Sequence, residues 1–297
     1  MKKIIFKFDE IFAACVKGKR YRDRELLREE VELNKFLRGA HKVFRIHGFY
    51  NIIYLYRDES VLYGWNKDFL ISLYEKKLVP KKVAGRFYYD KLKLLAPDNK
   101  CQICFYGEAD SLDHYLPKEL FPSLTISPYN LIPSCFSCNG KKSTYVPKTE
   151  SEQTIHSRFD KFFRSDWLGA AYSDSEGKVV FSPNNKIYPR GSIGFSRICN
   201  HMKVHDLDAL YETLALKKLK GLVALAKKTG QELRDIVILE IDKIMDNSEG
   251  YSYAQFTFDQ WKLAACKALL ESEYFLANGM RIFGAVDRYY LPDHDFD

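Results

Sequence analysis

The chain has 297 residues, of which 46% are hydrophobic and 15% aromatic, enough to build one large core or two modest ones. Such a composition excludes a largely disordered chain. The formal net charge of +7 permits contact with a polyanion but is too small for a binder that works through a basic tail alone. No apolar run approaches the roughly 20 residues that span a bilayer, and charged residues interrupt the first ten positions, unlike a signal peptide. We therefore expect a cytoplasmic protein that makes no contact with a membrane.

Residues 1–97 are expected to form a mainly helical N-terminal region. Apolar residues recur at mostly helical spacing in 23–38 and again in 66–77. Two short runs, Lys2–Phe8 and Ile52–Arg57, have the alternating or β-branched character of strands, and one or two strands are expected to join these helices.

The end of this region is basic. Seven lysines and arginines lie between Lys76 and Lys93, against one acidic residue, Asp90. A basic stretch of this kind can bind the phosphates of a nucleic acid, and it leads directly into a cluster of cysteines.

Residues 98–150 contain many prolines and are expected to be rich in loops. Four of the seven cysteines of the chain form two C-x-x-C pairs in this segment. Each pair places two thiolates on one tight turn, and both turns can reach a single tetrahedral Zn²⁺ ion. An odd number of cysteines in a reducing compartment also favours metal over disulfides. The sequence therefore predicts one structural zinc site, formed by Cys101, Cys104, Cys135 and Cys138.

The residues between and after the cysteine pairs carry a second pattern. Asp113-His114 is followed by Asn130-Leu131, and Asn139 stands directly after the last cysteine. In this combination, residues 98–145 resemble the HNH endonuclease family, whose metal site lies on a ββα element. The spacing is similar to that of HNH nucleases from bacterial and plasmid-borne genes, including some anti-phage defence systems. The resemblance does not extend to the flanking regions.

The resemblance implies a role for each of these residues in phosphodiester hydrolysis. His114 is the general base that deprotonates water, a task suited to its unperturbed pKa of about 6.5. Asp113 and Asn139 bind a catalytic Mg²⁺ or Mn²⁺ ion, and Asn130 braces the loop. Position 139 departs from the commonest family form, which has His there. Further phosphate contacts are expected from three lysines, Lys118, Lys141 and Lys142.

Residues 151–297 are expected to form a mainly helical C-terminal region with a possible hairpin. A strand from Lys178, a turn at Pro183-Asn184-Asn185 and a short return strand would make that hairpin. Helices are predicted near 206–228, 231–245 and 253–278. The run Cys199-x-His201-x-x-x-His205 has the spacing of metal ligands, but no fourth ligand is nearby, so we interpret Cys199 as a buried apolar residue.

Together these patterns predict an α+β protein in which a zinc-bound ββα element lies between two mainly helical regions. The favoured function is metal-dependent hydrolysis of DNA, with RNA as a further possible substrate. One alternative is a zinc module that binds nucleic acid without cutting it. Another is an effector subunit that stays silent until a partner protein, such as an ATPase sensor, activates it.

Overall fold

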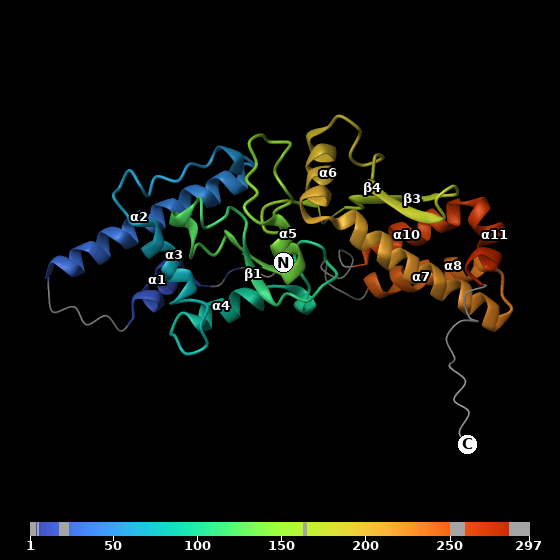
Figure 1. Ribbon diagram of the computed structural model, residues 1–297, viewed down its shortest axis with the longest axis horizontal. Coiled ribbons are helices and arrows are strands. Elements are labelled where there is room, and N and C mark those ends of the chain that lie inside the picture. Colours follow the sequence, from blue (N-terminus) through green and yellow to red (C-terminus); the bar gives the residue numbers. More distant parts are fainter. Residues whose placement is uncertain (1–3, 5, 18–23, 163–164, 250–258, 285–297) are drawn as a thin grey trace, which may run out of the picture. The chain divides into compact units, whose positions relative to one another are not determined.

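The computed structural model describes residues 4, 6–17, 24–162, 165–249 and 259–284. The chain divides into two compact units, and each is built from two stretches of the sequence. Unit 1 contains residues 1–163 and 191–206, and unit 2 contains residues 164–190 and 207–297. The predicted mixture of helix and sheet is confirmed (Figure 1). The regional boundaries expected at 97 and 150 do not coincide with the boundaries of these units.

Unit 1 joins a group of helices to a pair of short strands. Strands β1 (Ser111–His114) and β2 (Leu131–Ser134) are antiparallel, with Asp113 opposite Ile132 and His114 opposite Leu131. Helix α5 (Phe136–Lys142) follows β2 after one residue, Cys135. The other helices of this unit are α1 (Phe8–Val16), α2 (Arg24–Phe49), α3 (Lys67–Glu75), α4 (Arg86–Lys93) and α6 (Ile193–His205), with single 3-10 turns at Ile53–Leu55, Pro97–Asn99 and Pro122–Leu124.

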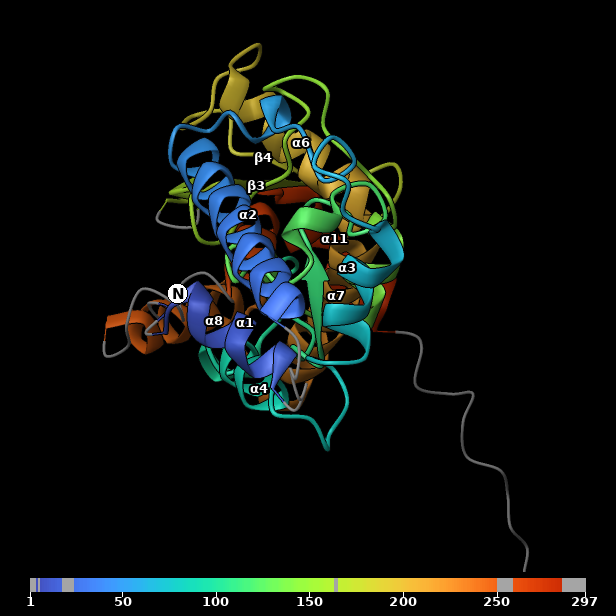
Figure 2. The same cartoon turned by 90° about the vertical axis from the view of Figure 1, so that its left-hand side faces the viewer.

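One apolar core connects the N-terminal helices to the strand pair. Helices α1 and α2 lie against each other (Figure 2), and their buried side chains Ile11 and Leu37 belong to the same cluster as Leu112 and Leu131 of the strands. Because each of these side chains is almost fully removed from water, the cluster contributes hydrophobic free energy to both parts at once. The strand pair is thus a face of this core and has no separate core of its own.

One predicted strand of the N-terminal region, Ile52–Arg57, was wrong. Ile52–Arg57 contains a 3-10 turn, because the Gln153 side chain satisfies this backbone: its amide donates to Asn51 O at 2.7 Å and its carbonyl accepts from Tyr54 N at 3.3 Å. No neighbouring strand is needed there. The run Lys2–Phe8 falls partly outside the described residues, and Phe8 begins α1.

In the part of unit 2 that the structure describes, one hairpin is accompanied by four helices. Strand β4 (Lys178–Pro183) was expected, but it pairs with β3 (Leu168–Ser173) before it and not with residues after Pro183. Gly177, with a φ of +63°, provides the left-handed backbone conformation that the β3–β4 turn uses. The helices are α7 (Leu207–Thr229), α8 (Leu233–Glu249), α10 (Gln260–Glu271) and α11 (Glu273–Phe283).

The single helix expected over 253–278 is divided into α10 and α11. Ser272 is extended, and its hydroxyl accepts from Phe275 N at 3.0 Å, so it caps the second helix where the first one ends. Residues 253–258 of that prediction lie outside the described residues. Among the helices that the structure describes, none is both long and apolar enough to cross a membrane.

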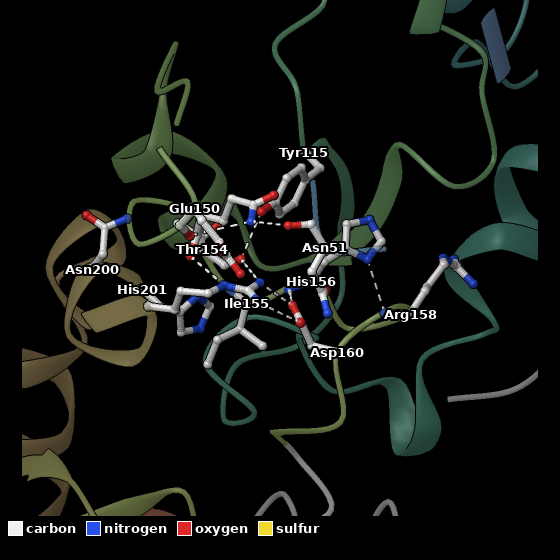
Figure 3. A network of polar contacts seen from close by, with 12 residues as sticks. Asn51, Tyr115, Glu150, Thr154, Ile155, His156, Arg158, Asp160, Asn200 and His201 are labelled. Carbon is white, nitrogen blue, oxygen red and sulfur yellow. Dashed lines mark hydrogen bonds and ion pairs between the residues drawn. The ribbon is translucent and has the colours of Figure 1, made fainter. Parts of the chain in front are cut away.

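A buried polar network fixes the segment after α5 to the strand pair and to α6 (Figure 3). The Arg197 guanidinium of α6 forms an ion pair with Asp160 at 2.6 Å and also donates to the carbonyl oxygens of Gln153 and Thr154. The Tyr115 hydroxyl, one residue after β1, donates to Thr154 O at 2.8 Å. Because Arg197 and Asp160 are shielded from water, each depends on the other for compensation of its charge.

Replacing Arg197 by methionine is therefore expected to destabilise the protein by about 3–5 kcal/mol, since a buried carboxylate loses its counter-ion. Urea unfolding followed by circular dichroism measures this loss. The matched control is Arg38→Met, which removes an ion pair with Asp9 whose side chains are 57% and 42% exposed. That change should cost less than about 1 kcal/mol. Equal losses of stability in the two variants would contradict the conclusion that Asp160 depends on Arg197 for compensation of its charge.

Candidate metal centre and adjoining pocket

The four predicted zinc cysteines come together at one point. Cys101 and Cys104 lie on a turn before β1, and Cys135 and Cys138 lie at the start of α5. Their sulfur atoms are all within 4.8 Å of one another, and three of the four residues are buried. Four thiol groups at this separation are the donor set that Zn²⁺ prefers in structural sites. The cluster can therefore hold a metal ion such as zinc.

The backbone around the first cysteine turn is held by hydrogen bonds to its neighbours. Cys101 N donates to Gly107 O at 2.7 Å, and Gln102 N donates to Pro133 O at 2.9 Å, which joins the turn to β2. Gly107 N also donates toward Cys104 Sγ at 3.5 Å. Such N–H donors stabilise thiolate charge and orient the sulfur toward a metal.

Gly107 is a residue of this site that the sequence did not reveal. A Cβ atom at this position would lie 3.0 Å from Cys135 Cβ and 3.2 Å from its sulfur, which is closer than ordinary contact. The absence of a side chain thus lets the two cysteine turns approach each other. Its position after the first cysteine pair does not distinguish it in the sequence, and only its contact with Cys135 does.

Beside the cysteine cluster lies a pocket of about 350 Å³ that gathers most of the predicted catalytic residues. Asp113 and His114 reach it from the end of β1, and Asn139 reaches it from α5. The strand pairing and the cysteine turn before α5 together bring these three side chains to one place. The pocket is lined by Tyr74, Leu112, Asp113, His114, Pro117, Lys118, Glu119, Asn139, Gly140, Lys142, Ser143 and Thr144.

The His114 imidazole is buried and oriented by two neighbours. Its Nε2–H donates to Thr125 O at 2.9 Å, and its ring meets the Tyr74 ring edge-to-face with centroids 4.4 Å apart. Burial, with a smaller contribution from the positive charges of Lys118 and Lys142, lowers the pKa of His114 to about 3. The unperturbed pKa that we expected is therefore wrong, and the ring is neutral at neutral pH.

Asp113 and Lys142 form a buried ion pair within the pocket. Lys142 Nζ lies 3.1 Å from Asp113 Oδ1 and donates to His114 O at 2.6 Å. Burial raises the pKa of the Asp113 carboxyl, and the Lys142 ammonium opposes this rise. The side chain of Lys142 is only 3% exposed and its ammonium already binds a carboxylate, so its expected contact with phosphate stays a prediction.

Asn130 does not line the pocket but lies beneath it, fully buried. Its side-chain oxygen accepts from Leu116 N at 2.8 Å, and its amide donates to Leu116 O at 3.0 Å. Its own carbonyl accepts from Tyr115 N at 2.8 Å. These bonds fix the backbone immediately after His114, which is the position expected of a bracing residue.

The remaining two predicted lysines already have acidic neighbours. Lys118 is partly buried, lines the pocket and pairs with Glu119 and, at 3.5 Å, with Glu75. Lys141 is exposed, does not line the pocket and pairs with Asp206 at the end of α6. Their contact with phosphate stays a prediction.

The run from Cys199 to His205 lies on α6 and does not join the cysteine cluster. Cys199 is exposed, so its interpretation as a buried apolar residue was wrong. His201 and His205 are buried on the opposite face, with ring centroids 4.9 Å apart. Their nitrogen atoms face backbone atoms of unit 1, including carbonyl oxygens of Ile103 and Cys138.

Comparison with known proteins finds similarity over parts of the chain. No family model and no solved structure matches it. Protein ea31 of Escherichia phage lambda is 38% identical over 117 residues, which are 38% of this chain and 39% of that protein. Septu protein PtuB of Bacillus thuringiensis is 41% identical over 68 residues, 21% of this chain and 26% of that protein. The chain thus matches less than half the length of either relative.

Removal of one cluster cysteine is expected to abolish metal binding. Cys138→Ser should purify without the single Zn²⁺ ion expected per chain, and its thermal midpoint should fall because metal binding contributes to folding free energy. Plasma mass spectrometry and thermal denaturation measure the two effects. Cys199→Ser, which changes an exposed cysteine outside the cluster, is the matched control and should retain its metal. Zinc at full occupancy in Cys138→Ser would refute the cluster as the binding site.

Unit 1 is also expected to lose stability in acid through its buried histidines. Burial lowers the pKa of His41 and His201 to about 4 and that of His114 and His156 to about 3, whereas in the unfolded chain each titrates near 6.5. As the pH falls below about 6.5, the unfolded state therefore binds protons first. The stability present above that pH is lost progressively toward pH 4.

Urea unfolding at several pH values measures this proton uptake. His156→Gln, which removes one of these groups, should lower the uptake between pH 6.5 and 5 by about one proton. Protonation of the cysteine cluster contributes equally to the proton uptake of the wild type and of the variant. Identical slopes for wild type and variant would show that His156 titrates normally in the folded chain.

Proposed function

We propose that this chain is a metal-dependent endonuclease of the HNH type, whose ββα element consists of β1, β2 and α5. The observation that carries the proposal is the shared pocket of Asp113, His114 and Asn139 beside the cysteine cluster. A site that only binds nucleic acid needs cations at its surface and has no use for an imidazole, a carboxylate and an amide in one pocket.

His114 acts in this proposal as the general base. Its Nε2–H is committed to Thr125 O, so in the neutral ring Nδ1 is the nitrogen that can accept a proton from water. The water oxygen then attacks phosphorus, the phosphodiester bond breaks, and the products carry a 5′-phosphate and a 3′-hydroxyl. The edge of Tyr74 and the bracing by Asn130 limit the rotation of the ring and of the strand end.

Asp113 and Asn139 supply the oxygen donors for a catalytic Mg²⁺ or Mn²⁺ ion. A carboxylate and an amide in an open pocket suit such an ion, which keeps positions for water and phosphate. When bound, the ion neutralises charge on the phosphate and on the departing oxygen. The pocket already favours a cation, because the Lys142 ammonium lies between Asp113 Oδ1 and His114 O. Binding of a divalent ion to Asp113 therefore competes with Lys142.

We place this activity in anti-phage defence. The partial similarity to Septu protein PtuB supports this assignment, and it suggests a partner protein in a defence system. Unit 2 is a separate compact part of the chain that supplies none of the pocket residues. Phosphodiester hydrolysis does not need unit 2, and binding of an activating partner such as an ATPase sensor would give this unit a role.

Cleavage of supercoiled plasmid tests the proposal. The purified protein should nick or linearise the DNA in Mg²⁺ or Mn²⁺ but not in EDTA, and His114→Ala should lower the rate about 100- to 10,000-fold, the typical contribution of a general base. His47→Ala, which changes a histidine that does not line the pocket, is the control and should cut normally. Equal cleavage by His114→Ala and wild type would exclude His114 as the base.

A nucleic-acid-binding module without catalysis is the second candidate. The observation in its favour is that Asp113 is already paired with Lys142, while the low pKa of His114 makes it a weak base. In that case the wild-type protein would shift DNA in a gel, hold zinc and fail to cut it, even after addition of the products of neighbouring genes. Cleavage that returns with such a product would instead identify the chain as an effector subunit.

A further inference from the structure

Helix α6 presents two buried histidines on one face. His201 and His205 are one helical turn apart, 0% and 3% exposed, and α6 packs directly against α5. The helix is fixed at its start by Ser192, whose hydroxyl accepts from Phe195 N, and at its end by Asp206, which pairs with Lys141 of α5. Both imidazoles are thus held toward the metal-binding part of unit 1.

The hydrogen bonds of His201 define its tautomer. Ile155 N donates to Nδ1 at 3.3 Å, so the ring proton is on Nε2, which donates to Ile103 O at 3.1 Å. Ile103 stands between Cys101 and Cys104, on the first cysteine turn. His201 therefore connects that turn to α6 and to the backbone of the 150–160 segment.

His205 makes the corresponding bond to the second cysteine turn. Its Nδ1–H donates to the carbonyl oxygen of Cys138 at 3.3 Å. The two turns belong to segments 30 residues apart, and Cys104 Sγ lies 3.9 Å from Cys135 Sγ where they meet. One rigid helix thus holds one backbone carbonyl of each turn.

We propose that His201 and His205 are positioning residues for the metal centre, which hold the two cysteine turns at the separation that a single Zn²⁺ ion requires. They do not belong to the group of four side chains that could hold the ion, and His201 Nε2 and His205 Nδ1 are each bound to a backbone carbonyl. Residues that orient metal ligands in this way typically contribute 10- to 100-fold to metal affinity. The proposal concerns zinc retention and does not depend on nuclease activity.

Amide substitutions of two lengths test the proposal. Gln places its amide near the Nε2 position and Asn near the Nδ1 position. His201→Gln should therefore keep the bond to Ile103 O and His201→Asn should lose it, while at position 205 the order is reversed, because Nδ1 is the donor there. All four variants remain polar; Gln is close to His in volume, and Asn is smaller at both positions. The readout is the rate at which zinc passes to a chromogenic chelator, with circular dichroism as the check of fold.

We expect His201→Asn and His205→Gln to release zinc roughly ten times faster than wild type, and His201→Gln and His205→Asn to release it at nearly the wild-type rate. A general loss of stability would not make Asn the substitution with faster zinc release at position 201 and Gln the one with faster release at position 205. His156→Gln, a substitution of a buried histidine that bonds to Tyr129 O and not to a cysteine turn, is the control for such a loss. Equal rates for both amides at each position would overturn the proposal.

Discussion

The convergence of four cysteine sulfurs within 4.8 Å is the constraint on which the site depends. The segment between the two cysteine pairs has 30 residues and forms only one four-residue strand and one 3-10 turn before β2 begins. A segment so poor in regular structure cannot by itself offset the conformational entropy lost on folding. A metal bound by both turns closes this loop in the folded state and contributes its binding free energy to folding. The β1–β2 pairing then sets which side chains meet across the pocket.

The buried pair of Asp113 and Lys142 shows how the site manages charge. A carboxylate removed from water is costly unless a cation accompanies it, and the Lys142 ammonium provides one. Its second bond, to His114 O, ties α5 to the end of β1. In the proposed function a divalent ion at Asp113 has to compete with this ammonium, because both cations bind the same carboxylate. Lys142 thus acts on the proposed metal site without being one of its ligands.

Much of the site could be predicted because its residues are close in sequence to features with strict spacing. Two C-x-x-C pairs restrict where a metal can bind, and this spacing places Asp113, His114 and Asn139 near that metal without knowledge of the flanks. The long amphipathic helices were predicted for a similar reason, since apolar periodicity is local. The register of the C-terminal hairpin was missed because the turn at Pro183-Asn184-Asn185 and the turn that ends at Gly177 are both plausible from sequence.

Other features depend on contacts between distant segments, which a single sequence does not contain. The depression of the His114 pKa comes from burial among α3 and the strand pair, and the placement of Lys142 from its partner Asp113, 29 residues away. The side chain of Gln153 donates to Asn51 O, 102 residues away in the sequence, at a place where a strand was predicted. Gly107 has a role only because Cys135 lies beside it. In each case the residue type was visible, but its neighbour was not.

The interleaved order of the two units has a further consequence for the site. The chain leaves unit 1 after residue 163, returns at 191 to form α6, and leaves again at 207. Segment 98–150 contains all four cysteines and the pocket residues of β1 and α5, yet it lacks Arg197, His201 and His205. A fragment limited to that segment would leave Ile103 O and Cys138 O without the donors that α6 supplies in the full chain. The part of the chain that supports the cysteine cluster therefore includes α6, which lies 43 or more residues beyond segment 98–150 and would be missed by a boundary drawn from the cysteine spacing alone.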